Sequence, residues 1–275
     1  MFIQTLLGKR DLLIPYFKFN VVARDATEQS AMQEIFRLRY EVYCVERHFL
    51  PEEEFRDGLE TDEYDACSTH VAAFAMDEQI IGTVRLVQPA QEQNYPFESH
   101  CTVFDDFVMP HRDAAGEVSR LVVRKTFRRR RGDSMEGVSE DFAEKGNVKS
   151  IKPRSGGKER DGNSPLLLLG LYREIYRYSR RNGIRYLYAA MERSLAKCLN
   201  KMGFVFVPIG PQTDYYGPVT PFVLDLDALD IRLNSDNKFL AAWFTDKPLP
   251  FTLILKTLFR NTWRDRQKSS KKTPT

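Results

Sequence analysis

The stretch Gly116-Glu117-Val118-Ser119-Arg120-Leu121-Val122-Val123 reads as a short buried strand, because branched aliphatic side chains dominate it. Two opposite charges lie within it, although burying a charge is costly unless the charge is paired. Residues three apart in a regular strand point to opposite faces, so Glu117 and Arg120 share a face only if a β-bulge adds a residue between them. The stretch therefore predicts an internal salt bridge or, if the charges serve chemistry, a functional site on a bulged strand.

A basic run, Arg124-Lys125-Thr126-Phe127-Arg128-Arg129-Arg130-Arg131-Gly132, follows this strand directly. It is either a solvated run of charge or a surface that meets a phosphate. The net charge of the whole chain is only +3, so its basic residues are clustered here and at 256–272. Because no base-stacking motif accompanies the run, we do not expect nucleic-acid binding.

The composition bounds the class of protein. A chain of 275 residues with 42% hydrophobic residues can build a core in one large domain or two small ones. The four cysteines form no C-x-x-C pair, which indicates a reducing compartment without a disulfide framework. The spacings of Cys67-x-x-His70 and His100-Cys101 are not those of a zinc motif, so we expect no metal site.

The N-terminal segment lacks the features of a targeting signal. Lys9, Arg10 and Asp11 interrupt its short apolar start, and no small-residue cleavage site follows. No uninterrupted apolar run reaches the roughly 18 residues that a membrane span needs. We therefore expect a cytoplasmic protein in which residues 1–20 form an N-terminal extension.

Residues 27–47 are predicted to form a helix, with Thr27 or Ser30 as its cap and apolar side chains at helical spacing. Arg39 lies on the apolar stripe of this helix, whereas Arg37 does not. A charged side chain on a buried stripe either extends its head group to the edge or faces a site.

The acidic segment that follows this helix is expected to be a loop. Asp62 and Asp65 stand immediately before a strand, where loops often carry binding groups. Residues 71–76 and 80–87 then read as a hairpin whose second strand contains Arg85, a third arginine in an apolar setting.

The remainder of the chain alternates helices and strands after an insertion. Residues 132–164 hold too few apolar side chains to offset their ordering entropy, so we predict a disordered insertion. Ser164-Pro165 reads as a helix start and Asn182-Gly183 as its stop. The elements expected after that are a strand at 184–190, a helix at 194–202, strands at 204–207 and 221–226, and a helical appendage with a basic tail at 231–275. The appendage either packs on the domain or touches a membrane or partner as an amphipathic segment.

The predicted order of elements gives an α/β chain with a mixed, mostly antiparallel sheet in a domain at 21–230. Over roughly residues 28–225 the pattern resembles the GNAT-like N-acyltransferase fold. More narrowly, it resembles the acyl-homoserine-lactone autoinducer synthases and the N-acyl amino acid synthases. The greatest resemblance is to bacterial acyltransferases associated with the PEP-CTERM/exosortase system.

Short blocks in the family's order carry this resemblance. Arg39 and Tyr43, in Phe36-Arg37-Leu38-Arg39-Tyr40-Glu41-Val42-Tyr43, look like the arginine and the aromatic residue of the first block. Asp62 and Asp65 match the D-x-x-D of these proteins. The tryptophan that they carry soon after the first block is absent, and His48-Phe49-Leu50 stands in its place.

Two further blocks lie on predicted strands. Arg85, in Gly82-Thr83-Val84-Arg85-Leu86, matches the strand arginine of the family, and Glu117-Val118-Ser119-Arg120 matches its E-x-S-R. The resemblance implies that Glu117, Ser119 and Arg120 form the catalytic set, with Glu117 as the proton acceptor. A backbone N–H near Ser119–Leu121 would stabilise the oxyanion.

The resemblance also implies the substrates. A thioester donor, either acyl carrier protein or coenzyme A, would place its pantetheine arm between strands splayed by the bulge, and no cofactor would be tightly bound. The residues implied at the acceptor are Arg39, Tyr43, Asp62, Asp65 and Arg85, with fold support as the alternative role for the charged ones. The residues implied at the donor are Leu121, Val122, Val123, Arg124, Lys125, Arg128, Arg129 and Arg130.

The expected function is therefore transfer of a fatty acyl group from the thioester donor to the amine of a small amino-acid-like acceptor. One alternative is an acyl-homoserine-lactone synthase that uses S-adenosylmethionine. The other is a non-catalytic module that binds an acyl carrier or an anionic surface.

Overall fold

The computed structural model describes residues 17–22, 28–128, 164–236 and 238–245, and an eight-stranded sheet lies at its centre. The strands are hydrogen-bonded in the order β1-β2-β3-β4-β5-β8-β6, and β7 pairs with β8. β4 and β5 run parallel and the other described pairs are antiparallel, so the predicted mixed, mostly antiparallel sheet is confirmed. The strands are β1 Lys18–Val22, β2 Ser68–Phe74, β3 Ile80–Val87, β4 Ala115–Val123, β5 Tyr186–Met191, β6 Val207–Pro208, β7 Thr213–Asp214 and β8 Pro218–Asp225.

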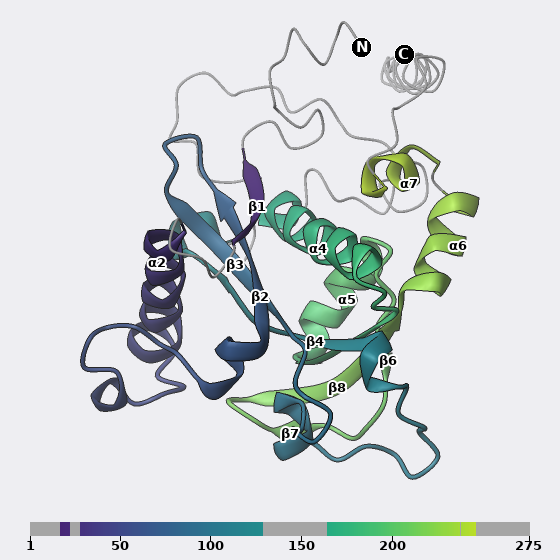
Figure 1. Ribbon diagram of the computed structural model, residues 1–275, viewed down its shortest axis with the longest axis horizontal. Coiled ribbons are helices and arrows are strands. Elements are labelled where there is room, and N and C mark those ends of the chain that lie inside the picture. The colour runs from purple at the N-terminus through teal and green to yellow at the C-terminus, as the bar shows by residue number, and fades with distance from the viewer. Residues whose placement is uncertain (1–16, 23–27, 129–163, 237, 246–275) are drawn as a thin grey trace, which may run out of the picture.

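Helices cover both faces of this sheet, with α2 on one face and α4 and α5 on the other (Figure 1). The helices are α2 Gln29–Tyr40, α4 Ser164–Arg181, α5 Arg193–Lys201, α6 Leu226–Asp236 and α7 Lys238–Phe244. The alternation of side chains along β2 lets one sheet serve two cores. Val71 and Ala73 pack with the leucine-rich start of α4, whereas Ala72 packs with Met32 and Ile35 of α2.

The first predicted helix is present, but its two ends differ from the prediction. Ser30 lies inside α2 rather than at its cap, and Glu28, which precedes the helix, makes no side-chain cap bond. Thr27 lies outside the described residues. Beyond Tyr40 the chain continues as a π-helical segment, Glu41–Glu46. Such segments are rare and frequently occur at functional sites.

The predicted insertion lies outside the described residues, apart from Ser164, with which α4 begins. α4 ends at Arg181, and Gly183 has a left-handed φ of 74°, as the predicted Asn182-Gly183 stop requires. Gly170 lets β1 approach this helix, because a Cβ there would lie 2.2 Å from the Phe19 ring.

The C-terminal helices begin earlier than the sequence predicts. α6 starts at Leu226, directly after β8, rather than at 231. Arg173 Nε and Arg177 Nη2 of α4 donate to the Trp243 carbonyl at 3.0 and 2.9 Å, which ties α7 to the domain. The strand predicted at 204–207 is reduced to the two residues of β6. None of the described helices is long and apolar enough to cross a bilayer.

Candidate active site

A β-bulge in β4 creates the site. Ser119 pairs with Arg85 and Val122 with Thr83, so three steps along β4 are matched by two along β3. Arg120, at the bulge, has a φ of 49°, a left-handed conformation that costs a non-glycine residue roughly 1–3 kcal/mol. The predicted bulge is therefore present, but its extra residue lies between Ser119 and Val122 rather than between Glu117 and Arg120 as predicted.

The bulge coincides with a gap in the sheet. β4 pairs with β5 only at Ala115–Glu117, opposite Tyr186–Tyr188, and the two strands separate beyond that point. A cavity of about 440 Å³ opens there. It is lined by β4 from Glu117 to Val123, by Val42, Tyr43, Arg47 and Phe49 after α2, by Ala189, Ala190, Met191 and Glu192 at the end of β5, by Leu168, Tyr172 and Leu195, by Tyr215, Tyr216 and Val219, and by Pro96 and Arg128.

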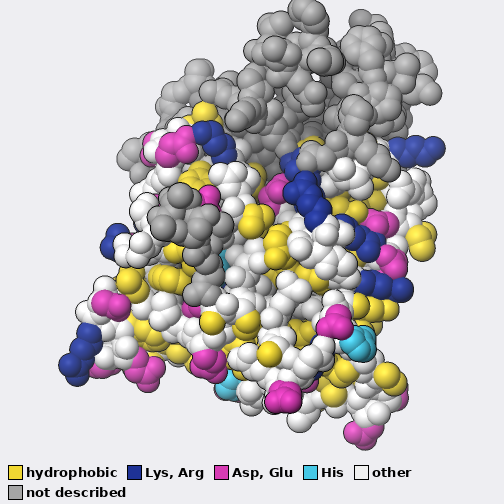
Figure 2. Space-filling model, in the orientation of Figure 1, with side chains coloured by type: hydrophobic (Ala, Val, Ile, Leu, Met, Phe, Trp, Pro, Cys, Tyr) yellow, Lys and Arg dark blue, Asp and Glu magenta, His cyan; other side chains and the backbone are white. Residues whose placement is uncertain are grey.

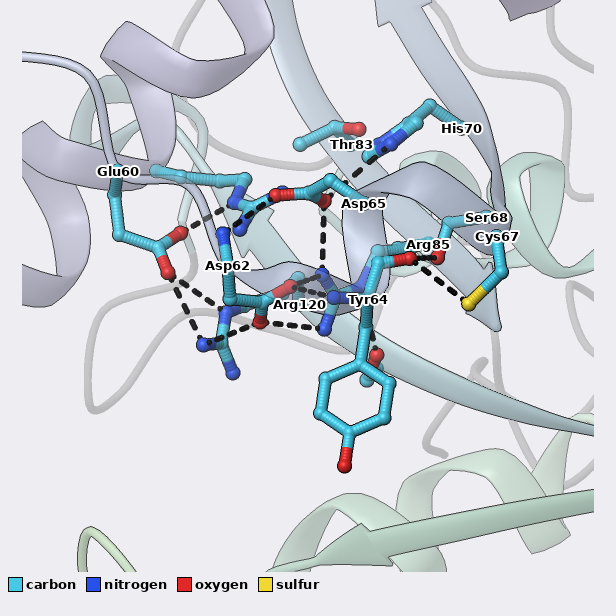
Figure 3. A network of polar contacts seen from close by, with 12 residues as sticks. Glu60, Asp62, Tyr64, Asp65, Cys67, Ser68, His70, Thr83, Arg85 and Arg120 are labelled. Carbon is cyan, nitrogen blue, oxygen red and sulfur yellow. Dashed lines mark hydrogen bonds and ion pairs between the residues drawn. The ribbon is translucent and has the colours of Figure 1, made fainter. Parts of the chain in front are cut away.

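Beside this cavity lies a buried network of three arginines and three acids, most of which Figure 3 labels. Arg39, fully buried, pairs with Glu60 and, at 2.6 Å, with Asp65. The other pairs are Arg85 with Asp65 at 2.8 Å and with Asp62 at 3.0 Å through its second nitrogen, and Arg120 with Glu60 at 3.1 Å and with Asp62 at 3.0 Å. The network is therefore electrically balanced within itself.

The D-x-x-D block has a local reason for its spacing. Asp62 caps the short 3₁₀ helix Glu63–Cys67 by accepting from the Tyr64 N–H at 3.0 Å, and Asp65 accepts from the Asp62 N–H at 2.8 Å. Burial alone would raise the pKa of Asp65, but the guanidinium groups of Arg39 and Arg85 hold it well below its usual range. Both aspartates are therefore fixed as charged acceptors.

Glu60 is the member of the network that the sequence analysis missed. It is fully buried, and its two oxygens accept from Arg39 and Arg120. Charge balance does not find it from the sequence, because the family blocks already supply three acids, Asp62, Asp65 and Glu117, for their three arginines, and only the fold brings Glu60 to Arg39 and Arg120.

Glu117 behaves differently from these acids. It is 2% exposed and accepts from the Phe97 N–H at 3.0 Å, and no salt bridge joins it to a described residue. Burial raises the pKa of Glu117 to about 8, although the Phe97 N–H and the charges of Arg85 and Arg120 act to lower it. The predicted Glu117–Arg120 salt bridge is therefore wrong, because the bulged strand pairs Arg120 with Glu60 and Asp62 instead. Removing Arg120 would leave Glu60 with Arg39 alone and Asp62 with Arg85 alone, and would break no ion pair of Glu117.

Aromatic rings form the wall of the cavity opposite β4. The Tyr43 ring lies 5.3 Å from the Arg120 guanidinium, and Phe49 lies 6.2 Å from both Tyr43 and Tyr216. Phe49 belongs to His48-Phe49-Leu50, which stands where the family's tryptophan is expected after the first block. This segment therefore also places an aromatic side chain at the cavity. Tyr43 thus lies where the sequence places a substrate contact.

The other predicted acceptor residues lie behind the wall rather than on it. Arg39, Asp62, Asp65 and Arg85 are not among the described residues that line the cavity. Ser119 lines it and accepts from Arg85 Nε at 3.1 Å, so this serine connects the network to the cavity. Leu121, Val122 and Val123 line the gap between the strands, where the donor is expected.

The basic run is partly neutralised by acids of the π-helical segment. Arg124 pairs with Glu41 at 3.0 Å and Arg128 with Glu46 at 2.5 Å, while Lys125 begins a short 3₁₀ turn, Lys125–Phe127. Arg129, Arg130 and Arg131 lie outside the described residues. On the face drawn in Figure 2, Lys and Arg side chains are interspersed with Asp and Glu rather than forming a continuous basic surface.

Comparison with known proteins agrees with this fold. Residues 38–136 match the family model described as the acetyltransferase (GNAT) domain. The AHL synthase LasI is similar over 80% of this chain and 96% of its own, with 16% identity and a TM-score of 0.54. The CoA-dependent acyl-homoserine lactone synthase BjaI, solved with MTA, is similar over 80% of this chain and 88% of its own, with 20% identity and a TM-score of 0.52. No curated protein matches the chain.

These similarities are at low identity and show the fold. The predicted GNAT-like fold is confirmed, and the matched domain is that of an acyltransferase, as predicted. The link to the PEP-CTERM/exosortase system stays a prediction.

Proposed function

We propose that this chain transfers a fatty acyl group from a thioester donor to the amine of a small amino-acid-like acceptor, and that it serves the PEP-CTERM/exosortase system. One observation carries the proposal: a buried carboxyl, Glu117, lies in a cavity at the separation of β4 and β5 and forms no ion pair with any arginine that the structure describes. A buried acid that is not spent on an ion pair is suited to proton transfer.

The cavity has the shape that a thioester donor needs. Its β4 wall, Ser119–Val123, runs beside a strand from which it has separated, so an extended pantetheine arm can lie along the strand. On the α4 and α5 side, Leu168, Tyr172 and Leu195 give an apolar lining that suits the acyl chain. The carrier of the arm is acyl carrier protein or coenzyme A, and Arg124 and Arg128 lie at the end of β4 where its phosphate would arrive.

The chemistry follows from the position of Glu117. The acceptor nitrogen, as the neutral amine, attacks the thioester carbonyl carbon and forms the C–N bond, the C–S bond breaks, and the donor leaves as a thiolate that becomes the thiol by taking a proton from the newly protonated Glu117 or from solvent. The nitrogen must lose a proton, and the Glu117 carboxylate takes it, directly or through a water. Because the pKa of Glu117 is about 8, kcat/KM should rise with pH up to that value as the carboxylate forms.

The charged network supports this site from behind. Arg85 donates to Ser119, and Arg120, at the bulge, lies over the Tyr43 ring at the cavity wall. We assign Arg39, Asp62, Asp65 and Arg85 to this support, because they lie outside the lining.

The experiment is mass spectrometry of lipid extracts from cells that express the chain or its Glu117→Gln variant. An N-acyl amine present only with the wild-type chain supports the proposal and identifies acyl length and acceptor together. An acyl-homoserine lactone would instead establish the alternative synthase activity. Binding of acyl carrier protein by the purified chain, without any product, would establish the non-catalytic alternative.

A further inference from the structure

We propose that Arg112 is a positioning residue for Glu117: it holds the turn Pro96–Ser99 in place, so that the Phe97 N–H stays on the Glu117 carboxyl. The inference rests on the proposed function, since it concerns the proton acceptor of that reaction. Arg112 is not among the described residues that line the cavity, although only the turn Arg112–Ala114 and the first residues of β4 separate it from Glu117. Its role is therefore to hold structure rather than to touch substrate.

The Phe97 N–H is the hydrogen-bond donor that the described structure gives to Glu117, at 3.0 Å. Phe97 is fully buried, with its ring 6.2 Å from Tyr95 and 5.2 Å from Tyr188. The ring fixes where the residue lies, but the direction of its N–H depends on the backbone of the turn. What holds the backbone therefore controls the hydrogen bond.

Arg112 holds that backbone through contacts at the start of the turn. Its Nη2 donates to Glu98 Oε2 at 3.0 Å, and the same oxygen accepts from the Tyr95 N–H at 2.6 Å. Its Nη1 donates to the Gln93 carbonyl at 2.7 Å, and its guanidinium lies 4.9 Å from the centre of the Tyr95 ring. One side chain thus contacts Gln93, three residues before the turn, Tyr95, which directly precedes it, and Glu98, the third residue of the turn.

The position of Arg112 in the chain explains why these contacts affect Glu117. Arg112 begins the short turn Arg112–Ala114, which leads directly into β4. The connection from β3 to β4 leaves the sheet at Gln88 and returns at Ala115, so Arg112 closes it near its end. We call the contacts of Arg112 with Gln93, Tyr95 and Glu98 the Arg112 clamp. The clamp connects the start of β4, the strand that carries Glu117, to the turn whose Phe97 N–H binds Glu117.

The surroundings of Glu117 predict the direction of the effect. Losing the Phe97 hydrogen bond removes an interaction that favours the carboxylate, so the pKa of Glu117 rises. Arg85 on β3 and Arg120 on β4 also favour the carboxylate, and Glu98 on the turn opposes it. The other titratable groups that interact with Glu117 are Tyr64, Tyr95, Cys101 and Tyr215.

The test is Arg112→Gln, with Arg185→Gln as its matched control. Arg185 likewise pairs with nearby acids, Asp225 and Asp227, but it is exposed and lies immediately before β5. We expect the acid limb of the kcat/KM profile to move upward by about one pH unit in Arg112→Gln and to stay in place in Arg185→Gln. A limb that is unchanged in Arg112→Gln, or that moves equally in both variants, overturns the proposal.

A second measurement separates this inference from the proposed function. The carboxyl carbon of Glu117 is titrated by ¹³C NMR and assigned with Glu117→Gln, which needs no turnover. An upward shift of its pKa in Arg112→Gln supports the clamp even if the chain proves to have no transferase activity, and an unshifted pKa overturns it. Should Arg112→Gln fold poorly, Arg112→Lys keeps the charge with fewer donors and is expected to shift the pKa in the same direction by less.

Discussion

Two sets of buried acids lie near one strand and differ in almost every electrostatic respect. Glu60, Asp62 and Asp65 accept from three arginines, and the pKa values of Asp62 and Asp65 are lowered although burial opposes this. Glu117 accepts from one backbone N–H, and burial raises its pKa to about 8. Burial is common to both sets, so the number of charged partners decides whether a buried carboxyl is ionised.

This difference in charged partners and in pKa gives the two sets of acids different roles. An acid that shares two guanidinium groups cannot readily take a proton, but it can fix the arginines and the loop that carries it. An acid whose protonated and ionised forms are close in free energy near neutral pH can exchange a proton with a substrate. The network and Glu117 are therefore support and chemistry, respectively.

Asp65→Ala should have the largest effect on the fold. The change leaves Arg39 and Arg85 without a shared acceptor in the core and removes the bond to the Asp62 N–H, so we expect a loss of about 3–5 kcal/mol in unfolding free energy. Urea denaturation measures it. Asp225→Ala is the control, because its pair with Arg185 is partly exposed and it also accepts from the Asp227 N–H at the start of α6, so losing both should cost about 2 kcal/mol or less. Equal losses would mean that the network is not structural.

Glu117→Gln should lower turnover and leave the stability of the fold unchanged, which is the converse of the result expected for Asp65→Ala. Glutamine keeps the shape of the side chain and can still accept from the Phe97 N–H, but it cannot take a proton, so turnover should fall by about 10²-fold or more. Unfolding free energy near pH 8 should not fall, since no buried charge remains to be formed. Turnover at saturating donor and urea denaturation are measured on the same preparation. Wild-type turnover in a folded variant would remove Glu117 from the mechanism.

How far the sequence could predict these two sets depends on the range of the contacts. The hairpin and the mostly antiparallel sheet follow from local patterns of apolar residues, the bulge follows from two charges within one apolar strand, and all three are present. Pairing did not follow, because proximity in sequence suggested Arg120 for Glu117, whereas the partner of Arg120 is Glu60, sixty residues away. Only the folded chain brings such groups together.

The same limit explains what was missed around Glu117. The turn Pro96–Ser99 lies in a segment that reads as an irregular loop, and a backbone N–H leaves no mark in a sequence. Glu60 was hidden for another reason, since it stands in an acidic stretch whose other members, Glu52, Glu53 and Glu54, are exposed. Counting charges within the family blocks does not single it out either, because Glu117 already supplies a third acid for the three arginines.

The pH dependence of stability should separate the two sets. The folded pKa of Glu117 lies above its ordinary value of 4.5, so its contribution is present below about pH 4.5 and is lost as pH rises towards 8. Relative to Glu117→Gln, the wild type should lose up to about 1.4 kcal/mol per pH unit in that window. Asp62 and Asp65 have lowered pKa values, so their contribution is present above about pH 4 and is lost as pH falls. Urea midpoints across both windows test this, and parallel curves for the two proteins would contradict the raised pKa.

Asp62→Asn should have the smallest effect of the predicted changes. It tests whether the ion-paired network influences the pKa of Glu117. Asparagine can still accept from the Tyr64 N–H, so the 3₁₀ helix keeps its cap, but the charge that faces Arg85 and Arg120 is lost. Those guanidinium groups also favour the ionised form of Glu117. With one counter-ion fewer they should attract its carboxylate more strongly, so the pKa of Glu117 should fall by about half a unit, or about 0.7 kcal/mol.

The readout is the acid limb of the kcat/KM profile, which should move to lower pH, opposite to the shift expected for Arg112→Gln. Glu63→Gln is the matched control, because it removes the same charge from the neighbouring residue, whose exposed side chain has no place in the network. If both variants moved the limb equally, the shift would reflect net charge alone. If neither did, the arginines would be screened from Glu117 and the two sets of acids would be independent. A shift in Asp62→Asn alone would mean that the balanced network, although it supports the fold, also sets the pH at which the neighbouring acid becomes a base.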